Sequence, residues 1–133
     1  MTEDQRETMK DIFGESIFVY TSQDAISDGI LFDITKINPA WRKGLINIVT
    51  TNLLNKGYID EDDTVNVPNL IDLLNQSLKI IERDSKKNNG LLDWFYSGSV
   101  ELPSGRKQKI FICQNETGSN NMPKYTIMLP EDY

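Results

Sequence analysis

The chain has 133 residues, of which 38% are hydrophobic and 26% are charged, and its net charge is −6. This length predicts a single domain covering residues 1–133. An acidic chain gains no affinity for phosphate backbones from counterion release, and no apolar run approaches the roughly 18 residues of a membrane helix. Direct nucleic-acid binding and a membrane span are therefore not expected.

The residue types narrow the chemistry further. The chain has no histidine and a single cysteine, Cys113. Ser-His-Asp and Cys-His mechanisms are excluded within one chain, and a zinc site is disfavoured. One cysteine cannot form an internal disulfide, which fits a reducing cytosol. We therefore predict a cytoplasmic protein without a cofactor or bound metal and, on balance, without enzymatic activity.

Short elements are expected at the beginning of the chain. Residues 2–12 predict a loosely docked helix, because few apolar positions offer it a packing face. The branched and aromatic run 17–20 predicts a strand, followed by one helical turn over 23–26. Apolar residues alternate over 30–34, which predicts a second strand with Asp33 on its less apolar side.

Two helices are expected in the middle of the chain. The first is predicted over 45–54, where apolar residues have helical spacing after Gly44, and it ends at Asn55–Gly57. An acidic loop over 58–66 follows. The second helix begins at Pro68, and its polar end lies within 84–90. Its predicted apolar stripe consists of Leu70, Leu73, Leu74, Leu78 and Ile81.

After Gly90 the apolar period changes to two. Residues 94–102, 107–114 and 124–129 predict three strands, joined by a compact turn over 103–105 and a looser loop over 115–121. Short connections favour an antiparallel meander. The predicted fold class is α+β: a single domain with two core helices packed on a mainly antiparallel sheet, with a C-terminal three-stranded meander and short N-terminal strands.

Two acidic groups are the candidates for a site. Asp24, Asp28 and Asp33 are able to hold Mg²⁺ together with a phosphate, but turn and capping bonds explain the same residues. The run Asp60–Asp63 invites a calcium site, but an EF-hand loop counted from Asp60 fails at its glycine and at its last ligand. We therefore predict a solvated loop there, with no catalytic residue and no metal ligand assigned.

Aromatic residues are the other candidates. Trp41 and Trp94 are predicted to pack in the core, but an exposed edge formed by Trp94, Phe95 and Tyr96 would indicate a partner surface. Cys113 is predicted to be a small buried residue and not a reactive thiol. The role of the basic turn from Arg106 to Lys109 stays open.

Both ends of the chain resemble a known pattern. The stretch YTSQDAISDGILFDIT (20–35), which begins at Tyr20, is similar to the N-terminal signature of a family of small proteins of unknown function from bacteria, archaea, phages and plasmids. The stretch TIMLPED (126–132) is similar to the end of that family, whereas Trp41 provides only a loose likeness in the middle. The resemblance implies a complete single domain and a mobile-element setting, and it brings no activity with it.

The leading functional hypothesis is a non-enzymatic binding or accessory protein of a phage, plasmid or other mobile element. Its partner is expected to be another protein, and both a monomer and a homodimer stay open. One alternative is an acidic mimic of nucleic acid that inhibits a host defence enzyme, because residues 1–65 carry twelve acids against six bases. The other is a metal-dependent phosphate-processing enzyme that uses Asp24, Asp28 and Asp33.

Overall fold

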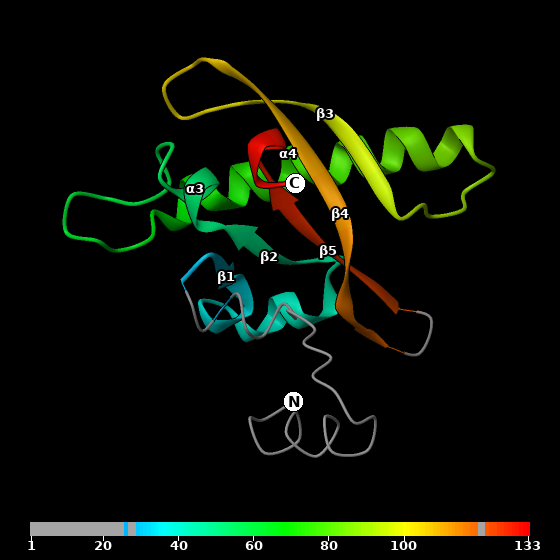
Figure 1. Cartoon of the computed structure of the whole chain (residues 1–133), viewed down its shortest axis with the longest axis horizontal. Coiled ribbons are helices and arrows are strands. Elements are labelled where there is room, and N and C mark those ends of the chain that lie inside the picture. Colours follow the sequence, from blue (N-terminus) through cyan, green and yellow to red (C-terminus); the bar gives the residue numbers. More distant parts are fainter. Residues whose placement is uncertain (1–25, 27–28, 120–121) are drawn as a thin grey trace, which may run out of the picture.

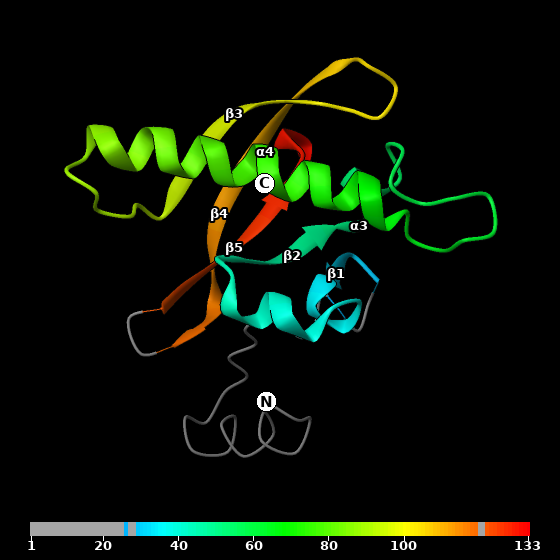
Figure 2. The same cartoon turned by 180° about the vertical axis from the view of Figure 1, so that it is seen from behind.

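A sheet with one long helix across one of its faces organises the computed structural model, which describes residues 26, 29–119 and 122–133 (Figures 1 and 2). The described residues form a five-stranded sheet with the order β1-β2-β5-β4-β3. The strands are β1 (Leu31–Asp33), β2 (Ile46–Thr50), β3 (Phe95–Glu101), β4 (Lys107–Ser119) and β5 (Met122–Met128). The α-helices are α3 (Thr51–Leu54) and α4 (Val67–Lys87), and the 3₁₀ helices are η1 (Ile34–Lys36), η2 (Pro39–Lys43) and η3 (Pro130–Asp132).

The predicted fold class is confirmed. Two α-helices and a mixed sheet form an α+β domain, and three of the four strand pairings in that described sheet are antiparallel. Strands β3, β4 and β5 form the predicted C-terminal meander. The remaining pairing joins β2 to β5 in parallel, so the chain crosses over through α4 between them, as parallel strands require.

The second helix of the prediction is confirmed, with one correction to its buried stripe. Asn66 caps α4, since its side-chain oxygen accepts a bond from Asn69 N (3.0 Å), and Pro68 lies in the first turn. Leu70, Leu73, Leu74 and Ile81 are buried as predicted, but Leu78 is 38% exposed. Ile80, which is 5% exposed, takes its place because the row that faces the sheet continues through Ser77 and Ile80.

The helix predicted over 45–54 is wrong over most of its length. Ile46–Thr50 is strand β2, and only Thr51–Leu54 is helical. The β-branched residues of β2 favour a strand, and four of its five residues are buried, so the apolar positions do not alternate. A strand buried on both faces resembles a helix in its apolar spacing, which explains the error.

Other predicted boundaries also change. Asn38 and Pro39 begin a helix as expected, but it is the 3₁₀ helix η2 and it ends before Gly44. The loop predicted over 115–121 is largely strand, because β4 continues to Ser119 with a shifted register against β5. The helix predicted over 2–12 and the strand predicted over 17–20 lie outside the described residues. Of the predicted turn over 23–26, only Ile26 is described, and its carbonyl accepts a bond from Gly29 N.

The core lies between α4 and the sheet. Buried residues from α4, from β2 to β5 and from the turn before α4 form one continuous cluster. Tyr58, Leu70, Ile112, Tyr125 and Ile127 are among its largest fully buried members. Within residues 26, 29–119 and 122–133, every helix is too short or too polar to cross a bilayer. Helix α4 therefore covers one face of the sheet.

A glycine sets the distance between α4 and β3. A Cβ atom added to Gly98 would lie 2.7 Å from Ile80 Cδ1, closer than atoms in a packed core approach. Gly98→Val is therefore expected to lower the free energy of unfolding by about 1–3 kcal/mol, measured by urea denaturation.

A second change tests that explanation. Ile80→Val removes the Cδ1 atom that the new side chain would meet, so it is expected to recover part of the loss in the Gly98→Val chain. Ser99→Val, at an exposed neighbouring position, serves as the control. If Ile80→Val simply adds its own loss to that of Gly98→Val, contact with Ile80 is not the cause.

Candidate functional site

The predicted acidic site is represented in the structure by one residue. Tyr20, Asp24 and Asp28 lie outside the described residues. Asp33 caps η1, where its Oδ1 accepts bonds from Thr35 N (2.9 Å) and Thr35 Oγ1 (2.5 Å). This is the capping role that the sequence offers as the alternative to a metal ligand. In the described part of the chain, no three residues of the types His, Cys, Asp and Glu are grouped to hold a metal ion.

The acidic run Asp60–Asp63 forms an exposed turn that is closed by its own bonds. Asp62 Oδ1 accepts bonds from Thr64 Oγ1 (2.6 Å) and Thr64 N (3.2 Å), and these bonds, the side-chain bond foremost, hold the pKa of Asp62 below its usual value. Asp60 Oδ1 accepts a bond from Asn66 Nδ2 (3.1 Å). The densest acidic run thus forms one compact turn, whereas a mimic of nucleic acid needs acids spread at phosphate-like spacing along a face.

Trp41 is half-buried against the core and borders a shallow cavity of about 200 Å³ between η2 and α4. Lys124 Nζ holds the end of η2 by donating bonds to the carbonyl oxygens of Arg42 (2.6 Å) and Gly44. Leu45, Leu74 and Leu78 contribute apolar walls. Ligand pockets usually measure about 300–1,000 Å³. Trp41 therefore has a packing role, as its core interpretation predicts, beside a cavity that is too small for most ligands.

The prediction that Trp94 packs in the core is wrong, because Trp94 belongs to an exposed group of rings. Its side chain is 60% exposed, and its ring centroid lies 5.4 Å from that of Phe95. Phe95 lies 4.9 Å from Phe111 and 5.6 Å from Tyr133, and Phe111 lies 5.5 Å from Tyr133, which is 68% exposed. These separations are typical of interacting aromatic pairs. We call Trp94, Phe95, Phe111 and Tyr133 the aromatic surface.

The strand register places the two phenylalanines on the face opposite α4. Phe95 pairs with Cys113, and Ser97 pairs with Phe111, so Phe95 and Phe111 are diagonal neighbours on adjacent strands. Their sequence neighbours Tyr96, Ile110 and Ile112 alternate to the other side and are buried in the core below α4. The side of the sheet away from α4 is the near side in Figure 1.

A contact between distant parts of the chain brings Tyr133 to this surface. Asp132 follows Pro130 in η3, and its carboxylate accepts bonds from Thr50 Oγ1 (2.8 Å) and Asn52 Nδ2 (2.8 Å). These bonds hold η3 against the junction of β2 and α3. Tyr133 then continues across the outer face, where its ring makes edge contacts with both phenylalanines.

One cation borders the aromatic surface. Lys109 Nζ lies 5.7 Å from the ring centroid of Phe111, within the range of a cation–π interaction. Lys107 pairs in register with Glu101 at the same end of the sheet. Within the basic turn from Arg106 to Lys109, Lys107 and Lys109 thus lie on β4, the strand that carries Phe111.

Cys113 lies next to the aromatic surface but does not supply a reactive group. Burial raises the pKa of its thiol to about 11, so the thiol stays protonated near neutral pH. Its Sγ lies 4.0 Å from Met128 Sδ on the neighbouring strand. The raised pKa agrees with the prediction of an unreactive thiol, but Cys113 is only half-buried and not fully buried as predicted.

Three comparisons with known proteins complete this description. No family model, curated protein or solved structure matches the chain. No residue role is therefore transferred from a relative.

The sequence pointed to part of this surface. The possibility of an exposed aromatic edge at Trp94 and Phe95 was visible in it, although Tyr96 turns into the core. Phe111 and Tyr133 are not among the candidates from the sequence, and the role of Lys109 was left open there. The alternation in 107–114 places Lys109 and Phe111 on one face, but only the pairing with β3 shows that Phe95 shares it.

Proposed function

We propose that the chain is a non-enzymatic binding protein whose partner, another protein, docks on the aromatic surface. The observation that carries this proposal is the exposure of Trp94 and Tyr133 within a connected group of four rings. Exposed apolar groups of this kind are uncommon away from interaction sites, and tryptophan and tyrosine dominate the energetic centres of protein interfaces.

The chemistry around the rings supports a partner that is apolar at its centre. Phe95 and Phe111 are already half-buried by each other, so a partner needs to order few side chains. Lys109 at the border suits a partner that places a carboxylate beside its apolar anchor. An apolar centre surrounded by a polar or charged rim is typical of specific protein interfaces.

The setting of this function is proposed on other grounds. The resemblance of both ends of the chain to small phage and plasmid proteins supports an accessory role in a mobile element. A single cysteine, half-buried and protonated, supports a reducing cytoplasm. The capping bonds of Asp33 do not favour the metal-dependent phosphate-processing enzyme, so the binding role is preferred.

Trp94→Ala is expected to weaken partner binding by at least about tenfold, because an anchoring ring at an interface contributes about 2 kcal/mol or more. The measurement is affinity capture from host cells with the wild-type chain, followed by titration of the purified captured protein against both chains. Ile71→Ala, at an exposed apolar position on α4 away from the rings, is the matched control and is expected to bind normally.

Intrinsic fluorescence provides a second measurement. The chain has two tryptophans, so Trp41→Phe leaves Trp94 as the only indole. Its emission is expected to shift to shorter wavelength, with reduced quenching by acrylamide, when the partner binds. A chain that captures no protein, or a complex in which Trp94 stays quenchable and Trp94→Ala binds normally, would contradict the proposal.

A further inference from the structure

The sheet has an open edge along β3. Edge strands of natural proteins are usually protected by shortness, charge, proline or a bulge. At the opposite edge, β1 has three residues. Over 95–99, β3 has the sequence FYSGS, without a charge or a proline, and its register against β4 has no bulge. This part of the edge lacks the usual protection.

The backbone direction along β3 follows from the bonds at its two ends. Trp94 O accepts a bond from Gln114 N (2.8 Å), and Leu102 N donates to Arg106 O (2.8 Å), so the even-numbered residues direct their backbone groups toward β4. Successive residues of a strand direct these groups to opposite edges. The backbone N–H and C=O groups of Phe95, Ser97 and Ser99 therefore point outward.

One end of this edge is closed by a side chain of α4. Gln76 Oε1 accepts a bond from Glu101 N (2.8 Å), and Gln76 Nε2 donates to Glu101 O (3.0 Å). The amide of Gln76 thus occupies the place of a neighbouring strand at Glu101. In the described structure, the outward groups of Phe95, Ser97 and Ser99 have no such partner, which leaves three donors and three acceptors open.

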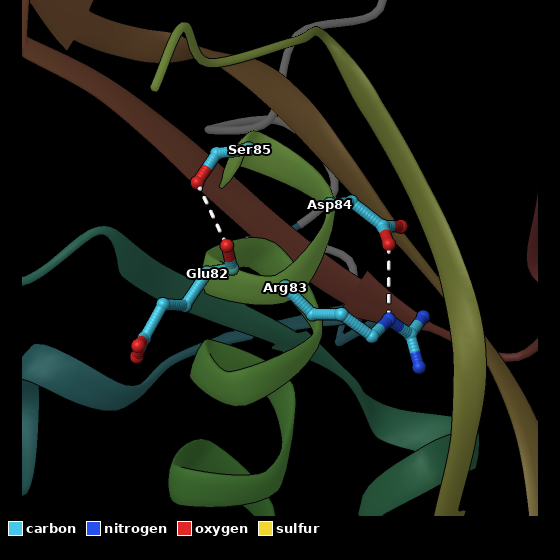
Figure 3. A network of polar contacts seen from close by, with 4 residues as sticks. All are labelled: Glu82, Arg83, Asp84 and Ser85. Atoms are coloured by element: carbon cyan, nitrogen blue, oxygen red, sulfur yellow. Dashed lines mark hydrogen bonds and ion pairs between the residues drawn. The ribbon is translucent and has the colours of Figure 1, made fainter. Parts of the chain in front are cut away.

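The helix row that contains Gln76 also carries a cation. Gln76 contacts Glu101, and Ile80 contacts Gly98, so residues three and four positions further along α4 continue on the side of β3. Figure 3 shows Arg83 and Asp84 extending on that side. Arg83 Nε donates to Asp84 Oδ1 (3.0 Å), and its two terminal nitrogens have no partner among the described residues.

The position of α4 favours a bare strand over a second copy of the fold. The C-terminal turns of α4 extend beyond β3 (Figures 1 and 2). A second copy joined to this edge in the antiparallel direction would bring its own α4 over the same face, into the space that the first helix occupies. An extended peptide has no such helix and passes beneath the turns that carry Arg83.

We propose that the 95–99 edge of β3 accepts an extended, acidic peptide segment of a partner protein as an added strand, with a carboxylate of that peptide bound by Arg83. Backbone pairing supplies affinity in this mode of recognition, and side-chain contacts supply selectivity. Arginine suits a carboxylate because its guanidinium presents parallel donors. Phe95 belongs to both the edge and the aromatic surface, but the edge uses its outward backbone groups and the aromatic surface uses its ring.

A peptide selection with a matched pair of variants tests the edge. A displayed library of random peptides of about ten residues is selected on the wild-type chain. The enriched peptides are synthesised, and their affinities are measured on Ser97→Pro and Ser97→Ala. Proline removes the outward N–H of residue 97 without removing a bond to β4, whereas alanine keeps the backbone unchanged. We expect enriched peptides to contain Asp or Glu and to bind Ser97→Ala normally but Ser97→Pro at least about tenfold more weakly.

Two further measurements separate the parts of the proposal. Arg83→Gln is expected to weaken the binding of acidic peptides. The binding of the same peptides with Gln in place of Glu is expected to stay unchanged. Amide hydrogen exchange, which needs no variant, is expected to slow at Phe95, Ser97 and Ser99 in the complex, while Tyr96 and Val100 are already protected by β4. If Ser97→Pro fails to fold, the hydrogen-exchange measurement alone tests whether the peptide pairs with the edge.

Several results would overturn the proposal. In the peptide selection, these are a library that yields no binder and peptides that bind Ser97→Pro as well as the wild-type chain. In the other measurements, they are unchanged exchange at the three outward amides and an affinity for acidic peptides that Arg83→Gln does not change. Trp94→Ala distinguishes peptide binding at the edge from protein docking on the aromatic surface. Peptide binding that survives Trp94→Ala supports the edge even if the proposed protein docking on the rings is wrong.

Discussion

Replacing Ile127 with alanine is expected to lower the free energy of unfolding by about 2–5 kcal/mol. Ile127 is fully buried on β5, the central strand, where it pairs in register with Val49 of β2 and Ile112 of β4. The shortened side chain loses apolar burial and leaves a cavity in the middle of the sheet. Neighbours held in two ladders have little freedom to fill that cavity, which places the loss in the upper part of the usual range.

Urea denaturation monitored by circular dichroism measures this loss. Ile30→Ala makes the same chemical change at a residue that is 51% exposed, beside β1, and is expected to cost less than about 0.5 kcal/mol. Similar losses for the two variants would show that β5 is not the centre of the core.

Alkaline pH is expected to unfold the protein through two buried tyrosines. Burial, with a smaller contribution from Asp72, raises the pKa of Tyr58 from 10.0 to about 12, and burial with smaller contributions from Tyr96 and Asp93 does the same for Tyr125. Both phenols are neutral below pH 10 in the folded and unfolded states, so stability is unaffected there. Between pH 10 and 12 only the unfolded state ionises readily. Each tyrosine is then expected to cost about 2–3 kcal/mol.

Phenylalanine variants separate the two contributions. The Tyr58 hydroxyl is buried and has no hydrogen-bond partner in the described structure. Tyr58→Phe is therefore expected to keep or raise stability by about 1 kcal/mol at neutral pH and to remove part of the alkaline loss. The Tyr125 hydroxyl donates to Asp93 O, so Tyr125→Phe is expected to cost about 1 kcal/mol at neutral pH.

Urea denaturation across this pH range, together with ultraviolet titration of tyrosinate, measures the effect. The thiol of Cys113, whose pKa burial raises from 9.0 to about 11, adds a loss that begins at lower pH. The comparison is therefore made in a Cys113→Ala chain. If the free energy of unfolding falls by the same amount at alkaline pH in the Tyr58→Phe chain and in the chain that keeps Tyr58, ionisation of Tyr58 does not contribute to the loss.

Local sequence patterns predicted the elements that bury one face and expose the other. Helix α4 has one buried stripe, a cap at Asn66 and a proline in its first turn, so its period and its beginning are visible in the sequence. Strands β3 to β5 are joined by short connections, which made the meander predictable. The prediction for the residues of β2 was wrong because both faces of this strand are buried. Burial on two faces removes the alternation that identifies a strand.

The candidate site depended on information that local patterns do not contain. Trp94 and Phe95 are adjacent in the sequence, but Phe111 joins them only through the register of β3 and β4. Tyr133 joins them through the bond from Thr50 to Asp132, which links residues 82 positions apart. Long-range pairing decides such contacts, and one sequence without structure does not specify register.

The parallel pairing of β2 with β5 has a consequence for how the protein is made. In the sheet, β5 separates β2 from β4, although it is the last of the five strands to leave the ribosome. A nascent chain that has reached residue 121 holds two partial sheets, β1-β2 and β3-β4, each with an unsatisfied apolar edge. Such species are prone to aggregate and are typical clients of chaperones. Completion of the core is therefore expected only after synthesis of the whole of β5.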